Sequence, residues 1–201
     1  MKSMSIEERF KKDVENHSIS IRMDNGVYRD IVCSNNGSWN QRFEIVTYPG
    51  YLVFCGDMGE WVFSRTKDMF KFFRRKDDGI NPGYWAEKCL AGKTTEYSEE
   101  KFREVMTDYA YHYFEDESQG ADLMEALQDE VFSRCDDGET RARDALDEFG
   151  FYPFGDVTRT PIRLEDTFEL NFREYTHHFL WALHAIVWAI NRYDSAQGKK
   201  S

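Results

Sequence analysis

The stretch SISIRMDNGVYRDIVC, residues 18–33, decides the fold. Apolar and polar residues alternate through it with the period of two that a half-buried β-strand produces. Asn25-Gly26 stands between the two alternating halves, and Asn-Gly in that position is the strongest short-range signal of a β-hairpin. The sequence therefore predicts two antiparallel strands, 18–24 and 27–33, joined by a tight turn.

The same pattern continues to residue 64. Strands are predicted at 42–48, 51–55 and 60–64, separated by Pro49-Gly50 and by Gly56-Asp57-Met58-Gly59. Short strands joined by tight turns indicate an antiparallel meander. We therefore expect a five-stranded antiparallel sheet over about residues 18–64, with the strand at 51–55, which is apolar on both faces, in its interior.

Helical periodicity follows the sheet. Thr66 is expected to cap a helix that ends at Arg75, Pro82 to begin a helical turn that includes Cys89, and Ser98 to cap a longer helix. This pattern predicts an α+β fold, with helices packed on the sheet and a long apolar C-terminal helix. The expected organisation is a single domain over residues 1–201, made of the sheet 18–64, a helical region 66–149, a connecting loop 150–166 and a last helix 167–195.

The last helix is apolar on most of its sides. Its stripe runs from Phe168 and Phe172 to Ile190, and Trp181 and Trp188 widen it. A helix of this kind lies either at the centre of a core or in an oligomer interface. We expect the core position, and a homodimer or an oligomeric assembly module built through this helix is the alternative.

The negative charge is concentrated in residues 99–149. This segment holds 17 Asp or Glu and five Lys or Arg, a net of −12, while the whole chain has a net charge of −11. Such polarity disfavours nucleic acid as a direct ligand and favours a basic partner surface.

Within this segment Asp122, Glu125 and Asp129 recur at the spacing of one helix face. Like charges at such spacings reduce helix stability, and a surface that serves only solubility normally mixes both signs. We therefore hypothesise that the face docks on a positively charged groove as a phosphate mimic; a merely solvated surface is the alternative. The predicted partner-binding residues are Glu115, Asp116, Glu117, Asp122, Glu125, Asp129, Glu130, Asp136 and Asp137.

A second candidate site is the glycine-rich turn that carries Asp57 and Glu60. Two carboxylates at such a turn can serve a small metal-assisted enzyme, with Asp77 and Asp78 as the further oxygen ligands. The alternative is a hairpin turn in which glycine supplies positive φ and Asp a local hydrogen bond. We favour the interpretation as a hairpin turn and expect no catalytic residue. An enzyme is therefore the less favoured class of protein.

Histidine and cysteine spacings predict neither a metal site nor a cofactor. His177, His178 and His184 of the last helix contain no pair at i, i+3 or i, i+4, the spacing of zinc ligands on a helix. The four cysteines form no C-x-x-C, and the first residues are polar, so we expect reduced thiols in a cytoplasm. The longest charge-free apolar run, 179–190, is too short to span a bilayer, and no membrane association is expected.

Several segments carry a resemblance to known proteins. The runs YPGYLVFCGDMGEWVFSR (48–65), DMFKFF (68–73) and INPGYWAEK (80–88), with RMDNGVYR (22–29) and YTHHFLWA (175–182), resemble a group of uncharacterised small proteins encoded in bacteriophages and prophages. The resemblance implies an accessory protein in the cytoplasm of a bacterial host and implies no activity. Because accessory phage genes often encode inhibitors of host defence, such as anti-CRISPR proteins, we expect an acidic inhibitor of a basic host protein or ribonucleoprotein complex.

Overall fold

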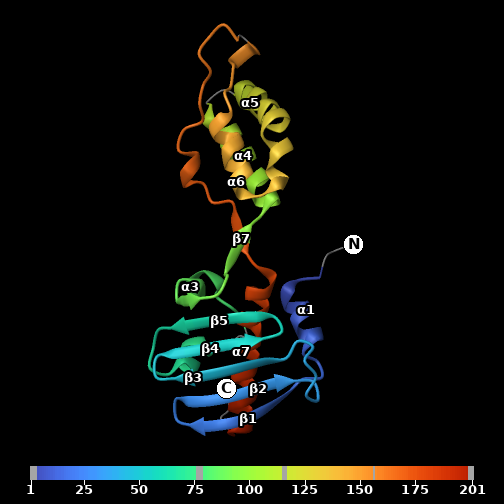
Figure 1. Ribbon diagram of the computed structural model, residues 1–201, viewed down its shortest axis with the longest axis vertical. Coiled ribbons are helices and arrows are strands. Elements are labelled where there is room, and N and C mark those ends of the chain that lie inside the picture. The colour runs from blue at the N-terminus through green and yellow to red at the C-terminus, as the bar shows by residue number, and fades with distance from the viewer. Residues whose placement is uncertain (1–3, 76–78, 115–116, 156, 199–201) are drawn as a thin grey trace. The chain divides into compact units, whose positions relative to one another are not determined.

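The computed structural model describes residues 4–75, 79–114, 117–155 and 157–198. Its contacts divide the chain into two compact units, a sheet unit (Met1–Thr95 and Tyr175–Ser201) and a helical unit (Glu96–Glu174). The short antiparallel strands β7 (Thr95–Tyr97) and β8 (Arg173–Tyr175) carry the chain from one unit to the other (Figure 1). The expectation of one domain over residues 1–201 did not anticipate this division.

The sheet unit is built on a six-stranded sheet with the order β1-β2-β3-β4-β5-β6. Every neighbouring pair is antiparallel, and β4 lies in the interior as predicted. The strands are β1 (Ser18–Asn25), β2 (Tyr28–Ser34), β3 (Phe43–Tyr48), β4 (Tyr51–Gly56), β5 (Gly59–Ser64) and β6 (Cys89–Ala91).

The sixth strand corrects the predicted count of five. Cys89, expected on a helix, lies on β6 and pairs with Phe63 of β5. The helix α3 (Pro82–Ala86) is capped by Asn81 and ends before Cys89. A three-residue strand is too short to display a period of two, so only its pairing across the sheet defines it.

Local turn chemistry accounts for the hairpins. Asn25 pairs with Tyr28, and Gly26 between them has a φ of +66°, the left-handed region that glycine adopts without strain. At the end of β4, a Cβ on Gly56 would lie 2.2 Å from the Arg42 carbonyl oxygen. Glycine is therefore required there for the close approach of β3 and β4.

Three further helices of the sheet unit begin at side-chain caps. Ser5 and Glu8 form a capping box at the start of α1 (Ile6–Asp13). Asp68, not Thr66, caps α2 (Met69–Phe73), which ends two residues before the predicted Arg75. The long helix α7 (His177–Ala196) is capped by Thr176.

The start of α7 corrects a second prediction. The helix expected from residue 167 begins ten residues later, because the preceding chain forms the 3₁₀ turn η3 (Thr167–Glu169) and β8. Phe168 is 75% exposed, and Phe172 lies in the core of the helical unit. Their helical spacing with the residues of α7 was therefore coincidental.

The core of the sheet unit is aromatic and is covered by α7 (Figure 1). Trp181 contacts Phe10 and Phe43 edge to face, with ring centroids 5.2 and 5.7 Å apart. Its indole N–H donates to Asp13 at 3.0 Å, so the polar atom of this buried ring is satisfied. Since most of α7 is buried in its own unit, the helix occupies the expected core position. The homodimer alternative stays a prediction.

The helical unit has a separate apolar core. Its elements are α4 (Glu99–Tyr113), α5 (Glu117–Glu130), the 3₁₀ helix η1 (Phe132–Asp137), α6 (Glu139–Glu148) and the short turn η2 (Pro153–Gly155). Phe102, Leu123, Leu127 and Phe172 are fully buried in it. In neither unit does a helix of the described residues combine the length and the apolar composition needed to cross a bilayer.

Candidate functional site

The predicted acidic residues lie on the surface of the helical unit. The side chains of Asp122, Glu125, Asp129 and Glu130 on α5, and of Asp136 and Asp137 at the end of η1, are all exposed. We call these six residues the acidic surface. Glu115, Asp116 and the side chain of Glu117 lie outside the described residues.

The apolar periodicity of α5 determines which way these carboxylates face. Leu123, Leu127 and Val131 recur every four residues, are fully buried, and hold one side of the helix against the core. The acidic residues occupy the intervening positions and are therefore turned to solvent.

Most basic residues of the segment 99–149 form ion pairs with other acids. Four of the five bases in the segment 99–149 bind acids outside the six, and Arg141, the fifth, is exposed. The pairs are Lys101–Glu104, Arg103–Glu99, Arg134–Glu148 and Arg143–Glu139. Within the described chain, none of the six carboxylates of the acidic surface has an ion-pair partner within 4.0 Å. Their charge is therefore not neutralised locally.

A hollow of about 480 Å³ adjoins the acidic residues of α5. Asp122, Glu125, Asp129 and Glu130 line it together with residues that follow α6, namely Gly150, Phe151, Tyr152, Gly155 and Val157. Among the residues after α6, Tyr152 is half-buried and Val157 is 73% exposed. No sequence signal predicts this contribution, because only tertiary packing brings these residues to α5.

The charge density of this surface is comparable with that of nucleic acid. Asp122, Glu125, Asp129 and Glu130 span about 12 Å of helix axis at about 1.5 Å per residue, or roughly one negative charge every 4 Å. A single strand of B-DNA carries one charge per about 3.4 Å of axis. The arrangement can therefore present to a basic groove a field similar to that of one phosphate strand.

The carboxylates of the glycine turn do not form a comparable site. Asp57 accepts a hydrogen bond from the Gln41 backbone N–H at 2.8 Å, where Gln41 has a left-handed φ of +53°. Asp57 thus stabilises a loop distant in the chain, at a residue with a strained backbone, and not its own hairpin turn as the alternative interpretation assumed. Glu60 is exposed on β5, and Asp77 and Asp78 lie outside the described residues.

Histidine and cysteine side chains are likewise dispersed. The rings of His177 and His178 are 5.9 Å apart at the start of α7. Among the described residues, no three His, Cys, Asp or Glu side chains are grouped so that they could hold a metal ion. All four cysteines are free, and burial raises the pKa of the Cys33 thiol well above its usual range, which disfavours the reactive thiolate.

Comparison with protein-family models, with curated proteins and with solved structures finds no match to this chain.

Proposed function

We propose that this chain is a binding protein that uses the acidic surface of its helical unit to dock on a basic surface of a partner. The partner class is a host defence or nucleic-acid-processing complex, either protein or ribonucleoprotein, in the cytoplasm of a bacterial cell. Binding there would exclude nucleic acid from the groove that the acidic surface occupies. The resemblance to phage-encoded proteins motivates this choice of partner class.

One observation carries the proposal: the six exposed carboxylates have no ion-pair partner in the described chain, while four of the five bases of the segment 99–149 bind other acids. A surface needed only for solubility gains nothing from this segregation of charge. Like charges at i, i+3 and i, i+4 on α5 instead reduce its stability. A basic partner would relieve that repulsion, and the unscreened field would accelerate its association.

The hollow beside α5 supports a particular mode of contact. Carboxylates together with Tyr152 and Val157 in one hollow suit an arginine side chain, whose guanidinium binds carboxylates and stacks on aromatic rings. Arginine is also a common phosphate-binding residue of nucleic-acid grooves. An arginine that normally contacts phosphate would therefore find similar charge and an added apolar contact here.

The proposal is tested by capture from a bacterial host lysate at low salt and at about 0.5 M salt, where the screening length falls to a few ångströms. The tagged parent chain is expected to retain a basic nucleic-acid-handling complex at low salt and to lose most of it at high salt. The triple variant Glu125→Lys, Asp129→Lys, Glu130→Lys is expected to retain none at either salt.

A matched variant separates the acidic surface from net charge. Glu15→Lys, Glu165→Lys, Glu169→Lys changes the net charge by the same amount at three exposed residues outside the acidic surface. It is expected to capture the partner as the parent does. Equal capture by the parent and by the variant reversed on α5 would show that the acidic surface is not the binding surface.

A further inference from the structure

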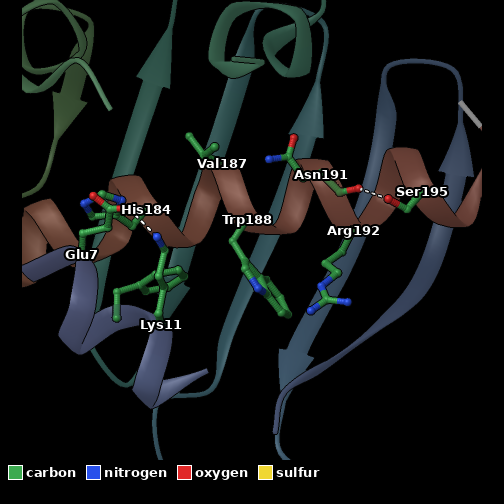
Figure 2. A pocket seen from close by; sticks show the side chains of 9 residues that line it. Glu7, Lys11, His184, Val187, Trp188, Asn191, Arg192 and Ser195 are labelled. Atoms are coloured by element: carbon green, nitrogen blue, oxygen red, sulfur yellow. Dashed lines mark hydrogen bonds and ion pairs between the residues drawn. The ribbon is translucent and has the colours of Figure 1, made fainter. Parts of the chain in front are cut away.

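A second concave site lies in the sheet unit, between α1 and α7. Its volume is about 310 Å³, and Figure 2 shows the residues that line it. Phe10, Val187 and Trp188 form its apolar walls, and Glu7, Lys11, His184 and Arg192 supply its polar groups. This volume is at the lower end of the range of small-molecule sites.

His184 is the buried polar group of this pocket. The residue is only 9% exposed, and its ring stacks on Phe10 with centroids 5.7 Å apart. It makes no hydrogen bond with any described residue, although its ring lines the pocket (Figure 2). Its ring nitrogens are not among the fully enclosed atoms without a hydrogen-bond partner, so they are accessible from the pocket and can form a hydrogen bond with a molecule bound there.

The protonation state of His184 defines what that partner offers. Burial, the largest influence, lowers its pKa; the charge of Glu7 raises it, and the charge of Lys11 lowers it. The net direction is downward, which favours the neutral ring at neutral pH. A neutral imidazole presents one donor and one acceptor, and both can serve a polar ligand.

The charged side chains leave the pocket with one excess positive charge. Lys11 and Glu7 pair with each other across one turn of α1 and cancel. Arg192 is exposed, with its guanidinium 5.2 Å from the centre of the Trp188 ring. It has no carboxylate partner among the described residues. Its charge is therefore available to a ligand that sits against the indole.

We propose that the pocket between α1 and α7 binds a small organic monoanion with a flat aromatic body. The anionic group contacts Arg192, the aromatic body packs between Trp188 and the Phe10–Val187 wall, and the His184 imidazole makes a hydrogen bond to the ligand. This site is chemically opposite to the acidic surface and does not depend on it. It adds a small-molecule ligand to a chain for which a macromolecular partner is proposed above.

Three probes that share one ring and differ in charge test this proposal: benzoate, benzamide and benzylammonium. Each is titrated into the full-length chain while the ring signals of His184 are followed by NMR, with assignment from a His184→Gln variant. A ligand of about nine heavy atoms is expected to bind in the millimolar range. The expected order of affinity is benzoate, then benzamide, then benzylammonium, with at least tenfold between the first and the last.

Arg192→Gln is the decisive variant, and it should fold because the side chain is exposed. It is expected to weaken benzoate about tenfold and to leave benzamide nearly unchanged. Arg65→Gln, which removes an exposed arginine outside the pocket, is expected to change neither. No saturable shift of the His184 signals with any probe up to about 50 mM overturns the proposal, and so does an equal response of the parent and Arg192→Gln to benzoate.

Discussion

In the sheet unit two ion pairs with a buried partner join segments that are far apart in the chain, whereas in the helical unit three ion pairs lie within single helices. Arg29 binds Asp68 at 2.9 Å, and Arg74 binds Asp194 at 2.6 Å through two hydrogen bonds. Both pairs are partly or largely buried, and one of them connects β2 to the cap of α2. The charges of these four side chains are neutralised within the fold and stabilise its tertiary structure.

The pairs of the helical unit have a different consequence. Lys101–Glu104, Arg103–Glu99 and Arg143–Glu139 are spaced three or four residues apart. All of these side chains are at least a quarter exposed or nearly so, and each pair contributes little to stability. Their effect is to occupy the bases and leave the acidic surface without counter-charge. Arginine–carboxylate pairs thus stabilise tertiary structure in the sheet unit. In the helical unit the ion pairs leave one face with negative charge only.

The largest expected effects come from the two cores. Phe179→Ala in the sheet unit and Phe102→Ala in the helical unit each remove a fully buried ring, and each should lower the free energy of unfolding of its own unit by about 3–5 kcal/mol. Hydrogen exchange read by mass spectrometry would localise the loss. If Phe102→Ala accelerated exchange in β3 and β4 as strongly as in α4, the two cores would form one cooperative block and the comparison would fail.

Breaking one ion pair in each unit should separate their roles. Asp68→Ala leaves Arg29 buried without its partner and removes the cap of α2, so the free energy of unfolding should fall by about 3 kcal/mol. Glu104→Ala, which removes the exposed partner of Lys101, should change it by less than about 1 kcal/mol. Denaturant titration measures both changes in the free energy of unfolding. Similar losses in the two variants would contradict the view that only the ion pair of the sheet unit stabilises the fold.

Acid should weaken the sheet unit through Asp68. Burial, the largest influence, raises the pKa of Asp68, but the hydrogen bond and charge of Arg29 together lower it, and the net shift is downward. A lowered carboxyl pKa contributes stability that is complete above the unfolded value of about 3.9 and is lost as the pH falls through the folded value.

The variant Asp68→Asn retains a capping residue and removes the charge. Its deficit relative to the parent should therefore be largest above pH 5 and should shrink as the pH falls below about 4. Unfolding curves measured between pH 6 and pH 3 check this, and a deficit that stayed constant with pH would exclude Asp68 as the responsible group.

The smallest expected effect is a gain in stability from neutralising the acidic surface. Glu125 has Asp122 three residues before it and Asp129 four residues after it, so Glu125→Gln should stabilise the helical unit by about 0.5 kcal/mol at low salt. The gain should vanish near 1 M salt, where charges are screened within about 3 Å. Glu104→Gln, which removes a carboxylate paired with Lys101, should give no gain in the same thermal unfolding assay.

The parts of the fold that depend on short-range signals were predictable. Alternation and the Asn25-Gly26 turn predicted the first five strands to within one or two residues at their ends, and Ser98 marked a helix start. The sixth strand was missed because it is defined by pairing rather than by period. The start of α7 was misplaced because Phe168 and Phe172 continue its spacing by chance.

The candidate sites divide in the same way. The exposure of Glu125 and Asp129 follows from the spacing of the apolar residues of α5, and that spacing can be read from the sequence. The loop that completes the hollow, and the meeting of α1 with Arg192 and Trp188, follow from packing between segments distant in the chain. No spacing rule reports such contacts, so only the folded structure could reveal them.

The central claim is that the acidic surface replaces nucleic acid on a basic partner. The most direct measurement is competition: the complex captured by the parent chain is bound to labelled nucleic acid, and the chain is added at increasing concentration. We predict that the parent displaces the nucleic acid, more weakly as salt increases, and that Glu125→Lys, Asp129→Lys, Glu130→Lys does not. Simultaneous binding of the parent chain and nucleic acid to that complex would contradict the claim.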